Sequence, residues 1–459
     1  MSRPLRILFT NITLATRTGT EAYIREAAVG LLRRGHSPVI YSPELGEIAE
    51  EIRAATIPVV DDLSRLGAPP DVIHGHHQQA MTALLHFPGV PAIFVTHDWT
   101  SWHDVPPLFP RIRRYVAVDW TNRDRVLFEH GIPEERVRVL LNWADLSRFP
   151  PRGPLPERPQ RALVFSNYAR EETHLPAIRE ACRRAGLPLD VAGSGVGRSL
   201  TRPGEVIAGY DLVFAKAKSA LEALAVGAAV VLCDFRGLGQ MVTTADFDAL
   251  RRLNLGYRTL HRPLDPDLIL REIERYDAHD AAEVARRVRD EASLEPALDR
   301  LVALYEEAIA EQEREGSVDP AEESRAAAVY LRDWTNTIPH LKNIDADRLH
   351  HYRRVKELEE ELRQVPSPHR LAELEEQLRQ GSHRQAELEE ELRQVRQAHG
   401  QAELDVQLRA TRLERDELAE TLRSVTGTIT WRLRERLMRA PGLRSAWRKI
   451  RGLGARQRT

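Results

Sequence analysis

Short apolar runs alternate with amphipathic segments along the first 150 residues. The run "RILF" predicts a buried strand, and further strands are predicted at "PVIYS", "DVIH", "AIFVT", "YVAV" and "VRVLL". After the first strand, we expect a helix from Thr20, whose hydroxyl suits an N-cap, to "RRGH", where Gly35 ends it. This alternation of strands and helices favours a parallel, doubly wound sheet.

A second run of the same kind follows a proline-rich segment. Residues 149–160, "FPPRGPLPERPQ", hold five prolines in twelve residues and predict a stiff linker. Beyond it, strands are predicted at "RALVFS", "LPLDVAG", "YDLVFA" and "AAVVLC", and the pattern is helical from Leu264 to about 315. We therefore predict domains at 1–150 and 161–315, a linker at 151–160, and a ligand-binding cleft between the two domains.

Past about residue 345 the composition shifts to Glu, Arg, Leu and Gln. The near-repeat "ELEEELRQV" begins at 357 and again at 387, and leucines at 358, 374, 388, 404 and 418 are spaced 16, 14, 16 and 14 apart. Fourteen is two heptads and sixteen is not, and prolines and glycines separate the blocks. We predict a helical connector at 316–345 and an interrupted coiled coil at 346–425 for self- or partner association; solvated single helices are the alternative.

The net charge of −2 is unevenly distributed. Between Trp431 and Thr459, ten Arg or Lys stand against the single acid Glu435, a net of +9, so the remainder is near −11. Tryptophans and leucines among these arginines suit a helix on an anionic membrane surface, so 426–459 is predicted to be a basic amphipathic tail. Nucleic-acid binding is the rival, which we disfavour because the body holds no recognisable nucleic-acid module.

Cysteine usage and the apolar runs indicate the compartment. Cys182 and Cys233 lie in apolar segments without paired metal or redox spacing, as in a reduced protein. The first residues hold a four-residue apolar run, too short for a signal peptide, and the longest apolar stretch is interrupted by Glu222. We expect a cytoplasmic protein, peripheral on the inner face of the plasma membrane where the tail binds lipid.

Histidines gather in "DVIHGHHQQA", residues 71–80, and one more follows in "FVTHDW". A zinc site is disfavoured because Gln78 stands where a zinc hydrolase of this pattern has Asp, and His76 and His77 point opposite ways in an extended chain. A cleft-lining role for one histidine and packing for the rest are the other interpretations. His97 ends a predicted strand, where its imidazole would bind a sugar hydroxyl or move a proton. The alternative is a surface histidine without a role in the site.

Three segments, each with a glycine-containing loop or the start of a predicted helix, suit a ligand that carries phosphate. "TRTGTEAY" places Gly19 before a helix N-terminus, and "VAGSGVG", 191–197, is a glycine-rich turn after a strand. In "YDLVFAKAKSALEALAVG" a helix is predicted from Ser219, with Lys216 or Lys218 supplying charge to a diphosphate. Glu222, in its first turn, would accept two hydrogen bonds from a ribose diol or only complement the helix dipole.

Together these segments resemble the GT-B glycosyltransferases of the family-four type. The resemblance rests on "GTEAYIREAAVGLLRRGHSPVIYS", "DVIHGHH", "FVTHDW", "RVLFEHGIPEERVRVLLNWADLSRF", "DVAGSG" and "KSALEALAVGAAVV", in the family's order. It implies two Rossmann-like domains facing a cleft, a nucleotide-sugar donor held without metal or cofactor, His97 near the transferred sugar and Glu222 on the ribose. A similar Trp-Arg ending closes coiled-coil extensions of bacterial surface-polysaccharide transferases.

The sequence departs from the family in two places. Phe214 stands where the family's first paired Glu is expected, and Arg170 is the nearest candidate for its Arg–Lys pair. The expected reaction moves a sugar from a nucleoside diphosphate sugar to a hydroxyl of a glycan or lipid-linked acceptor, in cell-surface polysaccharide synthesis. The alternatives are a nucleotide-sugar epimerase of the same fold and an inactive scaffold. Expected catalytic residues are His97, Arg170 and Lys218, and expected binding residues are Gly19, Thr20, Gly193, Ser194, Gly195, Ser219 and Glu222.

Overall fold

The computed structural model describes residues 3–332, except 16 and 100, together with residues 380, 383, 384 and 387. Apart from those four positions, the predicted coiled coil at 346–425 lies outside the described residues, and so does the predicted basic tail at 426–459. Both α/β halves belong to one compact unit. No described helix is both long and apolar enough to cross a membrane.

The first half is built on a seven-stranded sheet. All its pairings are parallel and the strand order is β3-β2-β1-β4-β5-β6-β7. The strands are β1 (Arg6–Thr10), β2 (Ser37–Tyr41), β3 (Val59–Val60), β4 (Val72–Gly75), β5 (Ala92–Thr96), β6 (Ile112–Ala117) and β7 (Val137–Val139). Every strand predicted for this half is confirmed. The two-residue β3 was not predicted, because it is too short to leave an apolar pattern.

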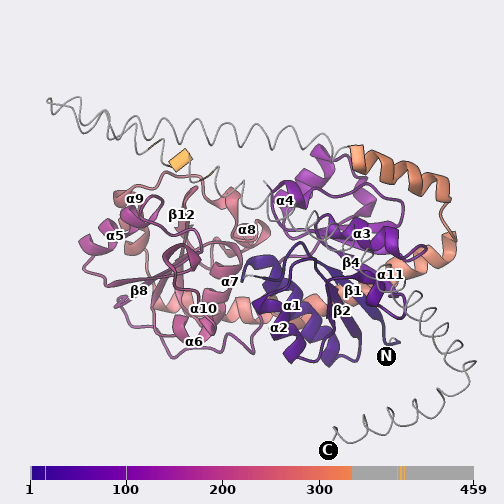
Figure 1. The fold of residues 1–459 in the computed structure, drawn as a ribbon. Coiled ribbons are helices and arrows are strands. Elements are labelled where there is room, and N and C mark those ends of the chain that lie inside the picture. Colours follow the sequence, from indigo (N-terminus) through magenta and orange to yellow (C-terminus); the bar gives the residue numbers. More distant parts are fainter. Residues whose placement is uncertain are drawn as a thin grey trace, which may run out of the picture. The chain divides into compact units, whose positions relative to one another are not determined.

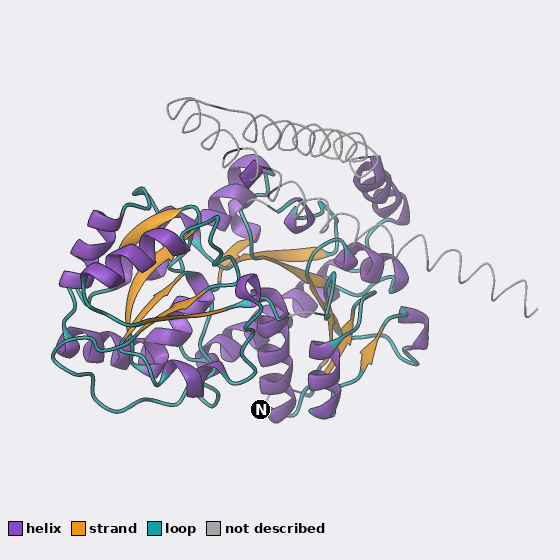
Figure 2. Ribbon diagram, turned by 60° about the vertical axis from the view of Figure 1, so that its left-hand side comes forward, coloured by secondary structure: helices purple, strands orange, loops and turns teal. Residues whose placement is uncertain are grey.

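Helices cover both faces of this sheet (Figures 1 and 2). Ile7 and Phe9 of β1 pack with α1 (Gly19–Arg33) and α2 (Glu47–Ala54), whereas Leu8 packs with α3 (Gln79–His86), because successive strand side chains point to opposite faces. The N-cap of α1 is Thr18, not Thr20 as predicted. Its end is as predicted, with Gly35 in a positive-φ conformation of 86°.

The second half is built on a five-stranded sheet of order β12-β11-β10-β8-β9. Its strands are β8 (Ala162–Phe165), β9 (Leu189–Ala192), β10 (Leu212–Ala215), β11 (Ala229–Asp234) and β12 (Gly237–Met241). The four predicted strands are confirmed as parallel neighbours, and β12, which was not predicted, adds to the edge antiparallel to β11. The prediction of two doubly wound α/β halves is therefore confirmed.

Helices surround the second sheet, and short helical turns lie in the loops of both halves. Around the second sheet lie α5 (Leu175–Arg184), α6 (Pro203–Ile207), α7 (Ala217–Val226), α8 (Phe247–Arg252), α9 (Pro266–Glu274) and α10 (Ala278–Glu291). In the first half, α4 (Trp120–Asp124) runs into the π-helical turn η3 (Arg125–Glu129). Single 3₁₀ turns are η1 (Leu63–Arg65), η2 (Trp102–Asp104), η4 (Glu134–Arg136), η5 (Ser194–Val196) and η6 (Tyr257–Thr259).

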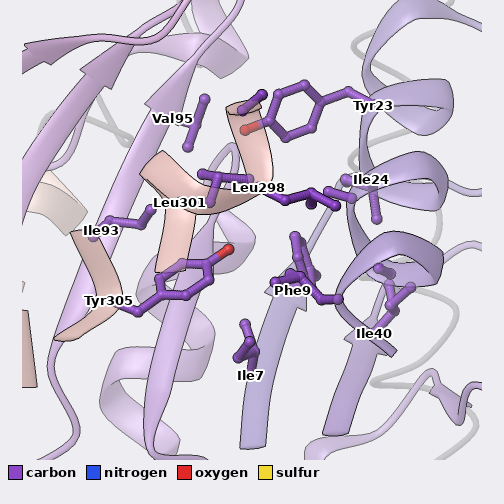
Figure 3. Close-up of a cluster of buried hydrophobic side chains, with 14 of the residues drawn as sticks. Ile7, Phe9, Tyr23, Ile24, Ile40, Ile93, Val95, Leu298, Leu301 and Tyr305 are labelled. Atoms are coloured by element: carbon purple, nitrogen blue, oxygen red, sulfur yellow. The ribbon is translucent and has the colours of Figure 1, made fainter. Parts of the chain in front are cut away.

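The last long helix, α11 (Leu294–Glu315), returns to the first sheet. Leu298, Leu301 and Tyr305 are buried in one cluster with Ile7 and Phe9 (Figure 3). The predicted boundary at 315 grouped these residues with the second half. The apolar spacing of α11 marks a buried face without indicating which sheet it covers.

Residues 320–332 form a further helix after α11. Ala326, Ala327 and Tyr330 pack against the α3 side of the first sheet. The fully buried Arg111, the residue before β6, anchors this helix, because its Nε donates to the Glu323 carboxylate at 2.5 Å. The beginning of the predicted connector is thus attached to the first half.

Candidate active site

A cleft opens between the two halves at the carboxyl ends of their strands. Its empty space is about 830 Å³, counted out to the open mouth. The first half contributes the loop after β1, and the second half contributes the loops after β8 and β9 and the first turns of α7, which follows β10. In each sheet these strands flank the point at which the strand order reverses, β1 beside β4 and β8 beside β10, where doubly wound sheets bind their ligands.

Cations outnumber carboxylates among the described residues that line this cleft. The cations are Arg17, Arg25, Arg148 and Lys218, and the carboxylates are Glu51 and Glu222. Arg25 pairs with Glu51 at 2.9 Å, and Arg17 pairs with Glu51 and, at 2.7 Å, with Glu47. Arg148 and Lys218 are not paired with Glu51; both lie near Glu26, a buried carboxylate outside the described lining residues. Cationic side chains at the cleft surface favour an anionic ligand.

Two helix N-termini reach the cleft from opposite sides. Gly19 is the first residue of α1, and Ser219 is the third residue of α7. The link from β10 to α7 consists of Lys216 alone, because α7 begins at Ala217. The free N–H groups and positive dipole end of each helix would bind phosphate or sugar oxygens.

The glycine-rich turn after β9 is fixed to the end of β8. Gly193 has a φ of 148°, and a Cβ there would lie 2.0 Å from the Ser166 carbonyl oxygen, so only glycine fits. Asn167 secures the turn by accepting the Ser194 N–H at Oδ1 at 3.0 Å. Its Nδ2 donates to the Arg17 carbonyl oxygen at 3.4 Å, which joins loops of the two halves across the cleft.

A buried group of charged residues forms the floor where α1 meets α7. The Lys218 ammonium lies 2.8 Å from Glu26 Oε2 and 3.6 Å from Glu222 Oε1, and donates to the Trp143 carbonyl oxygen at 3.1 Å. Glu26 also accepts Trp143 Nε1–H at 3.0 Å and lies 3.5 Å from an Arg148 nitrogen. Residues of both halves therefore share one set of ion pairs.

Burial dominates the ionisation of this group. It raises the pKa of Glu222 to about 7, because desolvation and the Glu26 charge outweigh the opposing effect of Lys218. Burial alone would lower the pKa of Lys218, but the Glu26 and Glu222 carboxylates overcome it and leave the pKa raised. Lys218 is therefore charged at neutral pH, whereas Glu222 titrates near it.

Three of the histidines form a stack in which His74 and His76 are buried and His97 is half-buried. The rings of His74 and His76 lie 4.7 Å apart and those of His76 and His97 4.9 Å apart, with Tyr23 edge-on to all three. His97 Nε2 is 2.9 Å from His76 Nδ1, and His74 Nδ1 is 2.5 Å from the Tyr305 hydroxyl. Burial lowers the pKa of His97 to about 3, so the ring is neutral at physiological pH. These contacts match the packing interpretation for His74 and His76.

A buried carboxylate holds the turn that carries His97. Asp104 Oδ2 accepts the backbone N–H groups of His97 and Asp98 at 2.5 and 2.6 Å. Burial raises the pKa of Asp104 well above its usual value. Asp104 thereby fixes the backbone at the carboxyl end of β5.

Among the described residues, no group of three or more His, Cys, Asp or Glu side chains is arranged to hold a metal ion.

The structure separates the predicted site residues into two groups. Those that line the cleft are Gly19, Gly193, Lys218, Ser219 and Glu222. Those outside the set of described lining residues are Thr20, His97, Arg170, Ser194 and Gly195. Ser194 and Gly195 still shape the turn beneath Asn167: a Cβ on Gly195 would lie 2.7 Å from the Asn167 carbonyl oxygen. Because α7 begins at Ala217, Glu222 lies one turn later in the helix than predicted.

The structure places both positions at which the sequence departs from the family pattern. Phe214 lies in the middle of β10 and is buried in the core that β10 shares with α5 and α9, so its position faces away from the cleft. Arg170 lies in the loop before α5, where its backbone N–H donates to Thr173 Oγ1 at 2.9 Å.

Sequence reasoning missed Arg17, Arg25, Glu26, Arg148 and Asn167. Four of them lie within the segments that carry the family resemblance or the glycine loop, "TRTGTEAYIRE" and "NWADLSRF". Arg17 and Arg25 flank the first turns of α1, so their charge beside a helix N-terminus was the available signal. Nothing in the sequence indicated Asn167, because it binds the glycine-rich turn after β9, which is distant in the sequence.

Comparisons with known proteins agree with the motifs. Residues 17–148 match the sequence model of Glycosyltransferase Family 4. No curated protein matches the chain. Among solved structures, a glycosyltransferase from Rickettsia africae ESF-5 is similar with 13% identity and a TM-score of 0.47, over 67% of this chain and 99% of that one. The Anabaena protein HepE, solved with UDP and glucose, is similar with 14% identity and a TM-score of 0.45, over 65% of this chain and 99% of that one. The match to the Glycosyltransferase Family 4 model thus covers the part of the first half in which the sequence motifs of that half lie.

Proposed function

We propose that the chain is a glycosyltransferase that moves a sugar from a nucleoside diphosphate sugar to a hydroxyl of an acceptor. The observation that carries the proposal is the cleft, where the N-termini of α1 and α7 meet the cationic side chains of Arg148 and Lys218. The family match over residues 17–148 supports the same reaction class.

In this proposal the donor lies across the cleft. The diphosphate rests on the amides at Gly19 and near Ser219, close to Arg148 and Lys218. Negative charge grows on the β-phosphate as the glycosidic bond breaks, and preorganised amides and cations stabilise it. Glu222, in its ionised form, accepts hydrogen bonds from the ribose hydroxyls.

His97 acts in this proposal as a neutral group. Its low pKa makes it unsuited to donate a proton at neutral pH, so it orients the sugar or the acceptor by hydrogen bonding. The proposed acceptor is a hydroxyl of a glycan or of a lipid-linked glycan in cell-surface polysaccharide synthesis. That choice is supported by the Trp- and Arg-rich sequence of 426–459.

The test begins with thermal unfolding of the full chain in the presence of UDP-, GDP-, ADP- and dTDP-sugars. Donor binding to the folded state raises the midpoint, by an amount that grows with ligand concentration above Kd. Product analysis with the stabilising donor and glycan or lipid-linked acceptors then distinguishes transfer from epimerisation of the donor. A chain that no nucleotide sugar stabilises, or that only epimerises the sugar, contradicts the proposal.

A further inference from the structure

Glu26 is a charged residue on which both halves of the molecule converge. It lies on α1, and its side chain is fully buried. Its carboxylate accepts hydrogen bonds from Trp143, which follows β7, and from Lys218 on α7 of the other half. Glu26 is not among the described residues that line the cleft, so it is placed to act through Lys218.

Lys218 is shared between two carboxylates at unequal distances. Its ammonium lies 2.8 Å from Glu26 and 3.6 Å from Glu222, and its remaining donor goes to the Trp143 carbonyl oxygen. Lys218 and Glu222 are four residues apart on α7, the spacing at which helix side chains meet. Without Glu26, the nearest carboxylate for the ammonium is therefore Glu222.

The position of Lys218 decides whether Glu222 is available to a ligand. A carboxylate that pairs closely with an ammonium has used acceptor capacity that ribose hydroxyls would otherwise occupy. In the present arrangement the closer ion pair is made with Glu26, and Glu222 stays at the cleft surface. Burial near Glu26 also keeps the pKa of Glu222 raised, which weakens its attraction for Lys218.

We propose that Glu26 is a positioning residue that draws the Lys218 ammonium toward the first half and so leaves the Glu222 carboxylate free to receive the donor's ribose. This inference rests on the proposed function. It assigns to Glu26 a contribution to nucleotide recognition from across the cleft, without contact between Glu26 and the nucleotide.

The test compares a ribonucleoside diphosphate with its 2′-deoxy form by calorimetry. The pairs are UDP, GDP and ADP with 2′-deoxy-UDP, 2′-deoxy-GDP and 2′-deoxy-ADP, and the pair whose ribo form binds most tightly is used. The full wild-type chain is expected to prefer the ribo form by about tenfold, the loss for one hydrogen bond to a charged group. Glu26→Gln is expected to reduce that preference to about twofold or less, because Lys218 then occupies Glu222.

Removing the lysine as well separates positioning from a purely structural role. In Glu26→Gln/Lys218→Met no ammonium remains to occupy Glu222, so the ribo preference is expected to return, even though overall affinity falls. A structural role alone would lower stability and affinity without restoring the preference. Glu26→Asp keeps the charge and is expected to keep the preference, which covers the case in which Glu26→Gln does not fold. Glu283→Gln, which removes an exposed ion pair with Arg286, is the matched control and is expected to behave as wild type.

The outcomes separate this inference from the proposed function. A ribo preference that survives Glu26→Gln, or that the added Lys218→Met does not restore, overturns the role of Glu26 while the proposed function stands. The same holds if the wild-type chain binds both forms equally. A wild-type chain that binds none of these nucleotides overturns the role of Glu26, and a chain that no nucleotide sugar stabilises overturns both.

Discussion

The ionisation of Glu222 gives the proposed site a measurable pH dependence. Its side chain is nearly buried, and burial raises its pKa to about 7 from an ordinary value of 4.5. Lowering the pH from 8 to 6 changes the ionised fraction from roughly ten in eleven to roughly one in eleven, which follows from a pKa near 7. Ribose hydroxyls need the ionised carboxylate as acceptor, so nucleotide affinity should fall by up to about tenfold, or ~1.4 kcal/mol.

The sign of this dependence follows from the direction of the pKa shift. A carboxyl with a raised pKa holds its proton in the folded state at pH values where the unfolded chain has lost it. The ionised form needed for ribose binding is therefore present above about pH 7 and lost below it. Protonated Glu222 is the form that burial favours, so its contribution to folding stability is fully present below pH 4.5 and is lost as the pH rises through about 7.

Calorimetric titration of the tightest-binding nucleoside diphosphate at pH 6, 7 and 8 measures the effect. The nucleotide's own phosphate also titrates near pH 6, so wild type is compared with Glu222→Gln at each pH. The ratio of the two affinities removes the ligand's contribution. We expect the ratio to rise with pH up to about tenfold. His97 does not contribute in this range, because its pKa is about 3. A ratio that stays constant from pH 6 to 8 would refute the assignment of Glu222.

Three further predictions concern the scaffold that holds the site. Asp104→Ala leaves the His97 and Asp98 amides without their acceptor and should lower the free energy of unfolding, measured by urea denaturation, by about 1–3 kcal/mol. The exposed control Asp61→Ala should change it by less than about 0.5 kcal/mol. Equal losses would show that Asp104 does not fix the turn. Leu298→Ala should cost about 2–5 kcal/mol in the same assay, because the side chain is fully buried between α11 and the first sheet, and a loss below about 1 kcal/mol would contradict the docking of α11. Arg111→Met should lower the free energy of unfolding by about 3–5 kcal/mol, because Glu323 loses its buried partner. It should also speed amide hydrogen exchange in residues 320–332, and unchanged exchange there would contradict the anchoring of that helix.

The apolar pattern predicted most of the fold because the strands of both sheets are buried on both faces. "AIFVT" and "AAVVLC" leave continuous apolar runs that few other structures explain. The pattern was silent on β3 and β12, which are a two-residue strand and a glycine-containing edge strand. It was also silent on the partner of α11, since the choice between two apolar sheets is made by tertiary packing.

The candidate site was predicted in part. Gly19, Gly193 and Glu222 were predicted as site residues and line the cleft, because glycine turns and helix starts indicate where the backbone can approach a ligand. Glu26 was not found, because an acidic residue in the middle of a helix is ordinarily solvated. His74 and His76 attracted attention through their residue type, and the stacking of their buried rings matches a packing role that spacing alone does not reveal.

The most direct measurement is a crystal structure of the full chain soaked with the nucleoside diphosphate that stabilises it most. Our account places the two phosphates between the amide groups at Gly19 and those near Ser219, with the ribose hydroxyls on the Glu222 carboxylate. Density for the nucleotide at any other surface, with this cleft empty, would contradict it.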